Sequence, residues 1–261
     1  MKKTNKKKLV KKTNKKSAKK TVKKVNKVNK TYVVLVVDES SSMSSLKDST
    51  ISAFNEQLNS LKTVGSEIKK NVIFVTFNSD VEWPVFDKPL EELNELNDDS
   101  YCPNGMTAMY DAIGLTVNKM HKELKDVRNE NVSVLFTVLT DGFENASRSC
   151  KKEDISSLVT ELTKTGRWTF SVLGANIDLN KMSDELKIAK SNMIRYKASS
   201  LGVARGLTAS SAGYAKYFDT METSGIITSN NLYSSNNDEV LDTTSEDFDL
   251  DKAIKSVETK K

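Results

Sequence analysis

Four short, apolar runs recur along the chain and constrain its fold more than any other feature of the sequence. They cover residues 32–37 (YVVLVV), 72–77 (VIFVTF), 132–140 (VSVLFTVLT) and 168–173 (WTFSVL), and none contains a charged residue. β-Branched and aromatic residues dominate each run. Strands that are buried on both faces have this composition. The runs therefore predict a sheet that is covered on both sides.

Stretches with helical periodicity separate these runs. Apolar or small residues recur at three- and four-residue spacing in four sets: Ile51, Phe54, Leu58 and Leu61; Ile113, Val117, Met120, Leu124 and Val127; Ile155, Leu158, Val159 and Leu162; and Ala204, Leu207, Ser211, Tyr214 and Phe218. We interpret each set as the core-facing side of a helix. Alternating strands and helices predict an α/β fold, with a doubly wound, mostly parallel sheet and helices on both faces. Residues 81–86 (VEWPVF) follow the second run after a short turn, which predicts an antiparallel hairpin strand, and Pro84 suits this strand to the sheet edge.

Charge divides the chain into three parts. Residues 1–30 contain 15 of the 40 basic residues and no acid. The rest of the chain contains the other 25 basic residues and all 35 acidic ones, so its formal charge is −10. Residues 238–251 contain seven acids and no base. Segments of this composition bury too little apolar surface to fold. We predict a disordered lysine-rich arm (1–30), a folded domain (31–218) and a disordered acidic and polar tail (219–261).

The lysine-rich arm has two interpretations. It can bind nucleic acid or another polyanion, or it can serve only as a solubilising tail. It contains no arginine and no aromatic residue, which are the side chains that read base edges or stack on bases. Any nucleic-acid binding is therefore expected to be unspecific.

Cysteine usage and hydropathy favour an intracellular, cytoplasmic protein. The two cysteines, Cys102 and Cys150, form neither a disulfide framework nor a zinc motif. The apolar runs are far shorter than the roughly 20 residues that span a bilayer, and no apolar signal-peptide region follows the N-terminal lysines. We expect no membrane association.

Two of the predicted strands end in an aspartate. Asp38 follows the first run and Asp141 follows the third, while Ser40 and Ser42 come after the first acid at alternate positions. Thr107 lies at the predicted start of the helix between those strands. Carboxyl ends of parallel strands meet at one edge of a sheet, so these five side chains are expected to gather there. Hard oxygen donors of this kind favour Mg²⁺ or Mn²⁺.

Each of these residues also has an ordinary structural interpretation. Asp38 and Ser40 can cap a helix, Thr107 can cap its own helix, and Asp141 with Gly142 suits a turn. The whole set, in order and at strand ends and a helix start, favours the metal site. Asp111 lies one turn into the helix after Thr107, where it can hydrogen-bond the site loops or merely complement the helix dipole. Glu39 and Ser41 are expected to face solvent.

In these motifs the sequence resembles the von Willebrand factor type A (VWA) domain family, over roughly residues 31–218. The family's metal-ion-dependent adhesion site is D-x-S-x-S, a threonine after G-x, and T-D-G. The chain has these as residues 38–42 (DESSS), 105–107 (GMT) and 140–142 (TDG). Residues 109–113, 141–148 and 173–176 further resemble stand-alone VWA proteins of bacteria and phages.

The resemblance implies a Rossmann-like, six-stranded sheet with the ion at its upper crevice. It implies that Ser40 and Ser42 bind the ion directly, Thr107 directly or through water, and Asp38 and Asp141 largely through water. An Asp or Glu of a protein partner would complete the coordination, so the expected function is that of a metal-dependent interaction module, a scaffold or a regulator.

Other functions fit the residues less well. A phosphatase that forms an aspartyl-phosphate has D-x-D at this loop, whereas Ser40 stands at the second position. A serine hydrolase requires a base, and the lone histidine, His121, lies within a predicted helix. No glycine-rich phosphate loop is present. We therefore expect a protein that is not an enzyme, with a nucleic-acid-associated protein anchored by its basic arm as the alternative.

Overall fold

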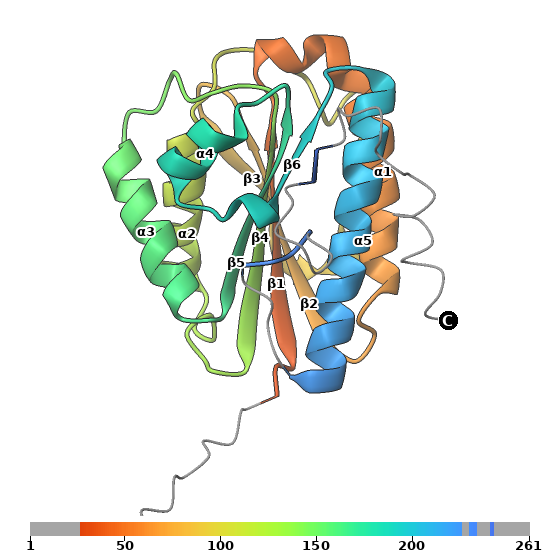
Figure 1. Cartoon of the computed structure of the whole chain (residues 1–261), viewed down its shortest axis with the longest axis vertical. Coiled ribbons are helices and arrows are strands. Elements are labelled where there is room, and N and C mark those ends of the chain that lie inside the picture. Colours follow the sequence, from red (N-terminus) through yellow and green to blue (C-terminus); the bar gives the residue numbers. More distant parts are fainter. Residues whose placement is uncertain (1–26, 226–229, 234–240, 243–261) are drawn as a thin grey trace, which may run out of the picture.

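A computed structural model of the chain describes residues 27–225, 230–233 and 241–242, and it places one sheet between two layers of helices (Figure 1). The elements are, in chain order, β1 (Lys30–Asp38), the 3₁₀ helix η1 (Ser41–Leu46), α1 (Lys47–Thr63), β2 (Lys69–Phe77), β3 (Val81–Pro89), η2 (Leu90–Glu92), α2 (Met109–Glu123), β4 (Val132–Thr140), α3 (Lys152–Lys164), β5 (Trp168–Ala175), α4 (Leu179–Leu186), η3 (Lys190–Asn192), β6 (Met193–Tyr196), α5 (Ser200–Ser224) and β7 (Leu241–Asp242).

The sheet has the strand order β3-β2-β1-β4-β5-β6-β7. Strand β1 lies in the middle, parallel to both β2 and β4, and β5 and β6 continue the parallel arrangement on one side. Strand β3 is antiparallel to β2 and forms one edge, where Pro84 loses no ladder hydrogen bond on its outer side. The two-residue β7 pairs with β6. The predicted Rossmann-like α/β fold, with its antiparallel edge strand, is confirmed.

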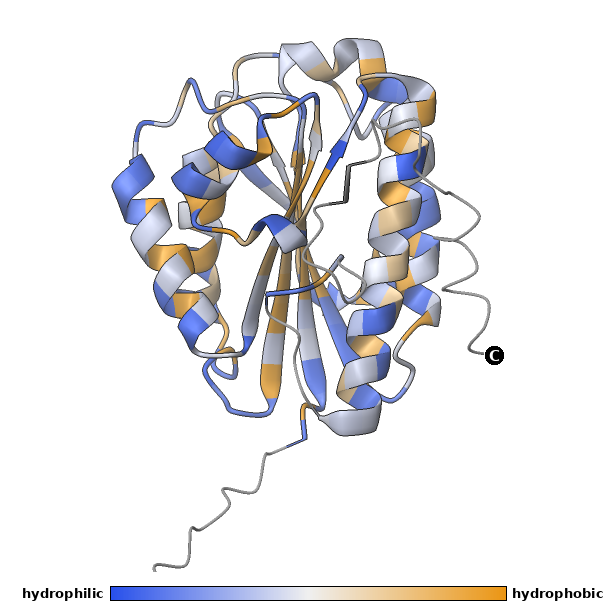
Figure 2. Ribbon diagram, in the orientation of Figure 1, coloured by the Kyte–Doolittle hydropathy of each residue, from blue (hydrophilic) through white to orange (hydrophobic). Residues whose placement is uncertain are grey.

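Alternate residues of the central strands face opposite helix layers. In β1, Val33, Leu35 and Val37 pack with α1 and α5, and the intervening side chains pack with α2 and α3. All nine residues of β4 are buried. Figure 2 shows hydrophobic residues along the central strands, and helices in which hydrophobic and hydrophilic residues alternate. The apolar runs are therefore explained by burial on both faces of the sheet.

The folded body extends past both predicted boundaries. Helix α5 continues to Ser224, and beyond it Leu232 is buried in the core against the layer formed by α1 and α5. At the other end Val28 is buried, and Lys30 begins β1 and pairs with Asp126 at 2.8 Å. The predicted boundaries at residues 30 and 218 are based on composition. Composition does not reveal a single apolar residue that packs against the core. The rest of the predicted arm and tail (1–26, 226–229, 234–240 and 243–261) lies outside the described residues.

The second predicted helix ends earlier than its apolar spacing indicates. Helix α2 ends at Glu123, yet Leu124 and Val127 are buried in the loop that follows it. The apolar spacing continues past the end of the helix because the loop that follows packs on the same core as the helix. In the part of the chain that the structure describes, no helix is both long and apolar enough to span a membrane.

Phe136, in the middle of β4, tests how much the fold depends on the central strands. Its side chain is fully buried, with its ring 5.2 Å from that of Phe170. We expect Phe136→Ala to lower the free energy of unfolding by about 3–5 kcal/mol, because it leaves a cavity in a packed core. Urea denaturation in chelator measures the change. Leu201→Ala, at an exposed site, is the control and should alter stability by no more than about 0.5 kcal/mol. Equal effects of the two variants would contradict the prediction.

Candidate metal centre

Parallel pairing of β1 with β4 brings two strand ends together. Val37 lies opposite Leu139 in the register, so Asp38 and Thr140 lie at the same end of the sheet. This is the edge formed by the carboxyl ends of the parallel strands, the upper edge in Figure 1. The Thr140 hydroxyl donates a hydrogen bond of 2.5 Å to Oδ2 of Asp38. Asp141 follows Thr140 directly. The two aspartates predicted from the strand ends therefore lie on neighbouring strands at one edge.

Asp38 is a fully buried carboxylate. Besides the Thr140 hydroxyl on Oδ2, its Oδ1 accepts the backbone N–H of Ser40 at 2.8 Å. Burial raises the pKa of Asp38 to about 6, and the charge of Asp141 adds to this effect, although the hydrogen bonds from Thr140 and Ser40 act in the opposite direction. Both oxygens of this side chain thus have protein partners.

Hydroxyl groups connect the first loop to Asp141. Ser40 Oγ and Ser42 Oγ are 3.1 Å apart, and Ser42 Oγ donates to Oδ1 of Asp141 at 2.6 Å. A methyl group added at Gly142 would meet Thr107 Oγ1 at 3.9 Å, so the threonine hydroxyl faces the turn after Asp141. The structure therefore brings all five predicted side chains to one edge of the sheet. Thr107 lies two residues before α2 begins, close to its predicted place at the helix start.

The loop that precedes Thr107 is joined to the loop after β1. Ser41 N–H donates to the carbonyl of Gly105 at 3.1 Å, and Asn104 N–H donates to the carbonyl of Glu39 at 2.8 Å. The Glu39 carboxylate also accepts the N–H of Cys102. Glu39 is partly exposed, and its bond to this loop amide is a contact that the prediction of a solvent-facing side chain did not include. Ser41 is exposed as predicted.

Gly105 is required by the conformation of the same loop. Its φ is +75°, and a Cβ at this position would lie 2.9 Å from Ser79 Oγ. Ser79 Oγ accepts the N–H of Met106 at 3.0 Å, which holds the turn after β2 against this loop. A side chain at Gly105 would be strained by its backbone and would disturb that bond. The positive φ and the contact with Ser79 thus explain why a glycine occupies the first position of the G-x-T motif.

The Asp111 carboxylate binds the loop between β4 and α3. It accepts backbone N–H groups of Arg148 (2.8 Å), Ser149 (2.9 Å) and Cys150 (2.7 Å). The side chain is nearly buried, and these bonds replace the water that it loses. Of its two interpretations, the hydrogen-bonding role is the one that the contacts support.

Sequence reasoning missed two residues of this loop. Glu144 accepts the N–H of Tyr110 at 2.8 Å, in the first turn of α2. Asn145 accepts the N–H of Thr107 at 2.9 Å and donates its own N–H to the Thr107 carbonyl at 3.0 Å. The sequence signal is the three polar residues of the run FENAS after T-D-G, and it does not show which backbone groups they bind.

The donor set fits a hard divalent cation. The side chains that meet at this edge supply hydroxyl and carboxylate oxygens and no sulfur or imidazole, the chemistry that Mg²⁺ and Mn²⁺ prefer. Within the described residues, no three His, Cys, Asp or Glu side chains group together as candidate ligands. An ion at this edge would therefore depend on the serine and threonine hydroxyls as well as the two aspartates.

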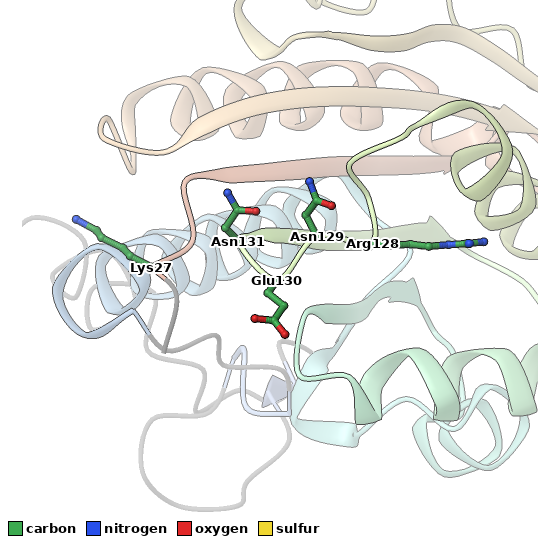
Figure 3. A pocket seen from close by; sticks show the side chains of 5 residues that line it. All are labelled: Lys27, Arg128, Asn129, Glu130 and Asn131. Atoms are coloured by element: carbon green, nitrogen blue, oxygen red, sulfur yellow. The ribbon is translucent and has the colours of Figure 1, made fainter. Parts of the chain in front are cut away.

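A shallow hollow lies at the opposite end of the sheet. It is lined by Lys27, Arg128, Asn129, Glu130 and Asn131, which precede β1 or β4. Figure 3 shows these side chains pointing in different directions, with the Glu130 carboxylate among them. They do not converge on one ligand position, so the hollow is a weaker candidate than the edge that carries Asp38.

Solved structures with similar architecture come from diverse organisms. The pilus adhesin SpaC of Lactobacillus rhamnosus GG, in an open conformation, has a TM-score of 0.53 and 14% identity, over 74% of this chain and 31% of the adhesin. A von Willebrand factor type A protein from Catenulispora acidiphila has a TM-score of 0.47 and 12% identity, over 72% of this chain and 43% of that one. The manganese-loaded TRAP protein of Plasmodium vivax has a TM-score of 0.45 and 20% identity, over 65% of this chain and 69% of that one.

These likenesses concern the fold alone, and this chain spans less than half the length of the Catenulispora protein. No curated protein sequence matches the chain. The profile of the von Willebrand factor type A domain, however, matches residues 33–206, two thirds of the chain. That range begins in β1 and ends within α5, so it includes every element that contributes to the candidate metal centre. The chain belongs to the von Willebrand factor type A domain family.

Proposed function

We propose that this protein is a metal-dependent protein-interaction module that binds Mg²⁺ or Mn²⁺ at the edge formed by Asp38, Ser40, Ser42, Thr107 and Asp141. VWA domains commonly work as modules of this kind. The observation that carries the proposal is the hydrogen-bonded path from Asp38 to the backbone amide of Ser40, and from the hydroxyls of Ser40 and Ser42 to Asp141. A bound divalent cation would present an open coordination position to an Asp or Glu of a protein partner.

The five proposed ligands would have different roles in binding the ion. Ser40 and Ser42 would offer neutral hydroxyl oxygens to the ion, and Thr107 would offer a third, directly or through water. Asp38 and Asp141 would act largely through water, which agrees with the engagement of both Asp38 oxygens by Thr140 and Ser40. Neutral donors leave positive charge on the ion, and that charge attracts an incoming carboxylate.

The placement of His121 supports binding rather than catalysis. It is the only histidine in the chain, and its ring packs against Trp168, with 5.7 Å between the ring centres. Trp168 begins β5, at the opposite end of the sheet from Ser40 and Ser42. The serines therefore have no nearby imidazole to act as a general base. We propose that the protein is not an enzyme.

An intracellular role as a scaffold or regulator is the setting that we propose. Cys102 is exposed and Cys150 is half-buried, and both are free thiols. Exposed free thiols persist in reducing compartments. The partner is a protein whose accessible Asp or Glu reaches the ion.

The lysine-rich arm favours a second candidate function, in which the protein also associates with nucleic acid. Fifteen lysines lie within residues 1–30, and the arm joins the domain at the start of β1. Asp38 is at the other end of that strand. The point where the arm joins the domain is therefore separate from the proposed ion site.

Metal addition tests the ion site directly. We expect Mg²⁺ at about 100 times its Kd to raise the free energy of unfolding by about 2.7 kcal/mol and Tm by about 5–10 °C, because only the folded chain assembles the site. Asp38→Asn and Ser42→Ala should remove the rise, and Ser41→Ala, in the same turn but outside the donor set, should keep it. Thermal unfolding in MgCl₂ and in chelator measures it. An unchanged Tm in the wild-type protein would refute the site.

Partner capture tests the interaction role. We expect a specific protein partner to be retained by the immobilised chain in Mg²⁺ and released by chelator, because its carboxylate is held through the ion. Ser42→Ala should lose the partner, whereas Ser41→Ala should keep it. Retention that is insensitive to both chelator and Ser42→Ala would show that the interaction does not use this site.

Salt dependence tests the basic arm. We expect duplex DNA affinity to fall steeply with salt, with a log–log slope of about −0.9 for each phosphate that a lysine neutralises. Fluorescence anisotropy of a labelled duplex measures the slope. Removal of residues 1–26 should abolish binding, and Ser42→Ala should leave it unchanged. Equal affinity without the arm would reject the second candidate function.

A further inference from the structure

Helix α2 begins without a cap of its own. Ala108, at the N-cap position, has no side-chain oxygen for the first free amides of the helix. Those amides find acceptors in the loop between β4 and α3: Tyr110 N–H donates to Glu144, and Asp111 N–H donates to Ser147 Oγ at 2.9 Å. A segment more than 30 residues later thus supplies the caps that the first turn requires.

Asn145 of the same loop holds the backbone of Thr107 from both directions. Its side-chain Oδ1 accepts the Thr107 N–H at 2.9 Å, and its backbone N–H donates to the Thr107 carbonyl at 3.0 Å. Asn145 follows Asp141 by only four residues. One short loop therefore carries one proposed ligand and fixes the backbone of another.

We propose that Asn145 is a positioning residue of the metal centre, which sets the Thr107 hydroxyl relative to Asp141. This inference rests on the proposed function. Asn145 does not belong to the D-x-S-x-S, threonine or T-D-G positions, and it acts through the backbone of Thr107 rather than on the ion.

The physical reason lies in the geometry that the ion demands. Mg²⁺ accepts only near-octahedral arrangements with short, uniform distances to oxygen. Thr107 lies in irregular backbone before α2, where no helical or sheet hydrogen bond fixes its dihedral angles. The two bonds from Asn145 restrain Thr107 itself. The flanking amides of Met106 and Ala108 are held separately, by the turn after β2. Loss of such supporting contacts typically weakens metal affinity by about 10–100-fold.

The chain offers a matched control in Asn55. Asn55 also holds one backbone residue from both directions: its Oδ1 accepts the N–H of Leu96 at 2.7 Å, and its Nδ2 donates to the Leu96 carbonyl at 2.9 Å. Asn55→Ala removes both of these bonds, whereas Asn145→Ala removes only the side-chain bond to the Thr107 N–H. These bonds of Asn55 join α1 to the connection between η2 and α2 at Leu96, eleven residues before Thr107, and they contact none of the five proposed ligands. Asn55→Ala thus removes an asparagine clamp on the backbone without touching the metal centre.

The test is a calorimetric titration of the full chain with MgCl₂. We expect Asn145→Ala to weaken Mg²⁺ affinity at least tenfold, and Asn145→Gln, which keeps the amide but lengthens the side chain, to do the same. Asn145→Asp retains an acceptor for the Thr107 N–H and should restore affinity close to that of the wild type. Asn55→Ala should bind Mg²⁺ as the wild type does. Amide hydrogen exchange without metal gives a second readout, in which Thr107 should exchange faster in Asn145→Ala but not in Asn55→Ala.

The outcomes separate this inference from the proposed function. If the wild type binds Mg²⁺ and Ser42→Ala does not, the site stands. Wild-type affinity in both Asn145→Ala and Asn145→Gln would then overturn the role of Asn145 alone. Equal losses in Asn145→Ala and Asn55→Ala would also overturn it, because they would indicate general destabilisation. If the wild type itself binds no Mg²⁺, the proposed function and this inference fail together.

Discussion

The parallel pairing of β1 with β4 is the constraint on which the candidate metal centre depends. It places the ends of two buried strands side by side, and the hydrogen bond from Thr140 to Asp38 joins them at 2.5 Å. Without that pairing, Asp38 and Asp141 would be two unrelated turn residues a hundred positions apart in the chain. The helix layers on both faces stabilise this arrangement, because β1 and β4 bury apolar side chains on each side. Site and core are consequences of the same strand arrangement.

The pairing also creates an electrostatic demand at the sheet edge. Asp38 loses its hydration on folding, and the pKa of its carboxyl group is raised to about 6 chiefly by that burial. Asp141 adds a second negative charge next to it. Hydrogen bonds from Thr140 and Ser40 offset part of the cost, and a divalent cation would offset more. A protein whose edge is built in this way has a physical reason to bind a cation there.

Around these carboxylates, the loops form hydrogen bonds with one another. The loop after β1 bonds the loop before α2 through Glu39 and Ser41, and the loop after β4 caps α2 through Glu144. Asp111 returns the contact by accepting three amides from the loop after β4. Loop backbone cannot remain unpaired when it is removed from water, so each segment provides acceptors for another. Hydrogen bonds consequently connect the loops at this edge, so a displacement of one loop would strain its bonds to the next.

The sequence by itself determined the strands of the central sheet, the helix faces and the five oxygen-bearing residues, because burial on two faces and short motifs at strand ends leave local patterns. It gave no clear signal for β6 and α4, which have only four and eight residues, and it ended the domain before Ser224 and Leu232. Only the tertiary structure decided that Glu39 binds a loop amide, that Asp111 binds the loop after β4, and that Asn145 clamps Thr107. Those contacts join side chains to backbone groups distant in sequence, and a backbone amide is the same in every residue except proline. No pattern of side chains along the chain can therefore mark its partner in advance.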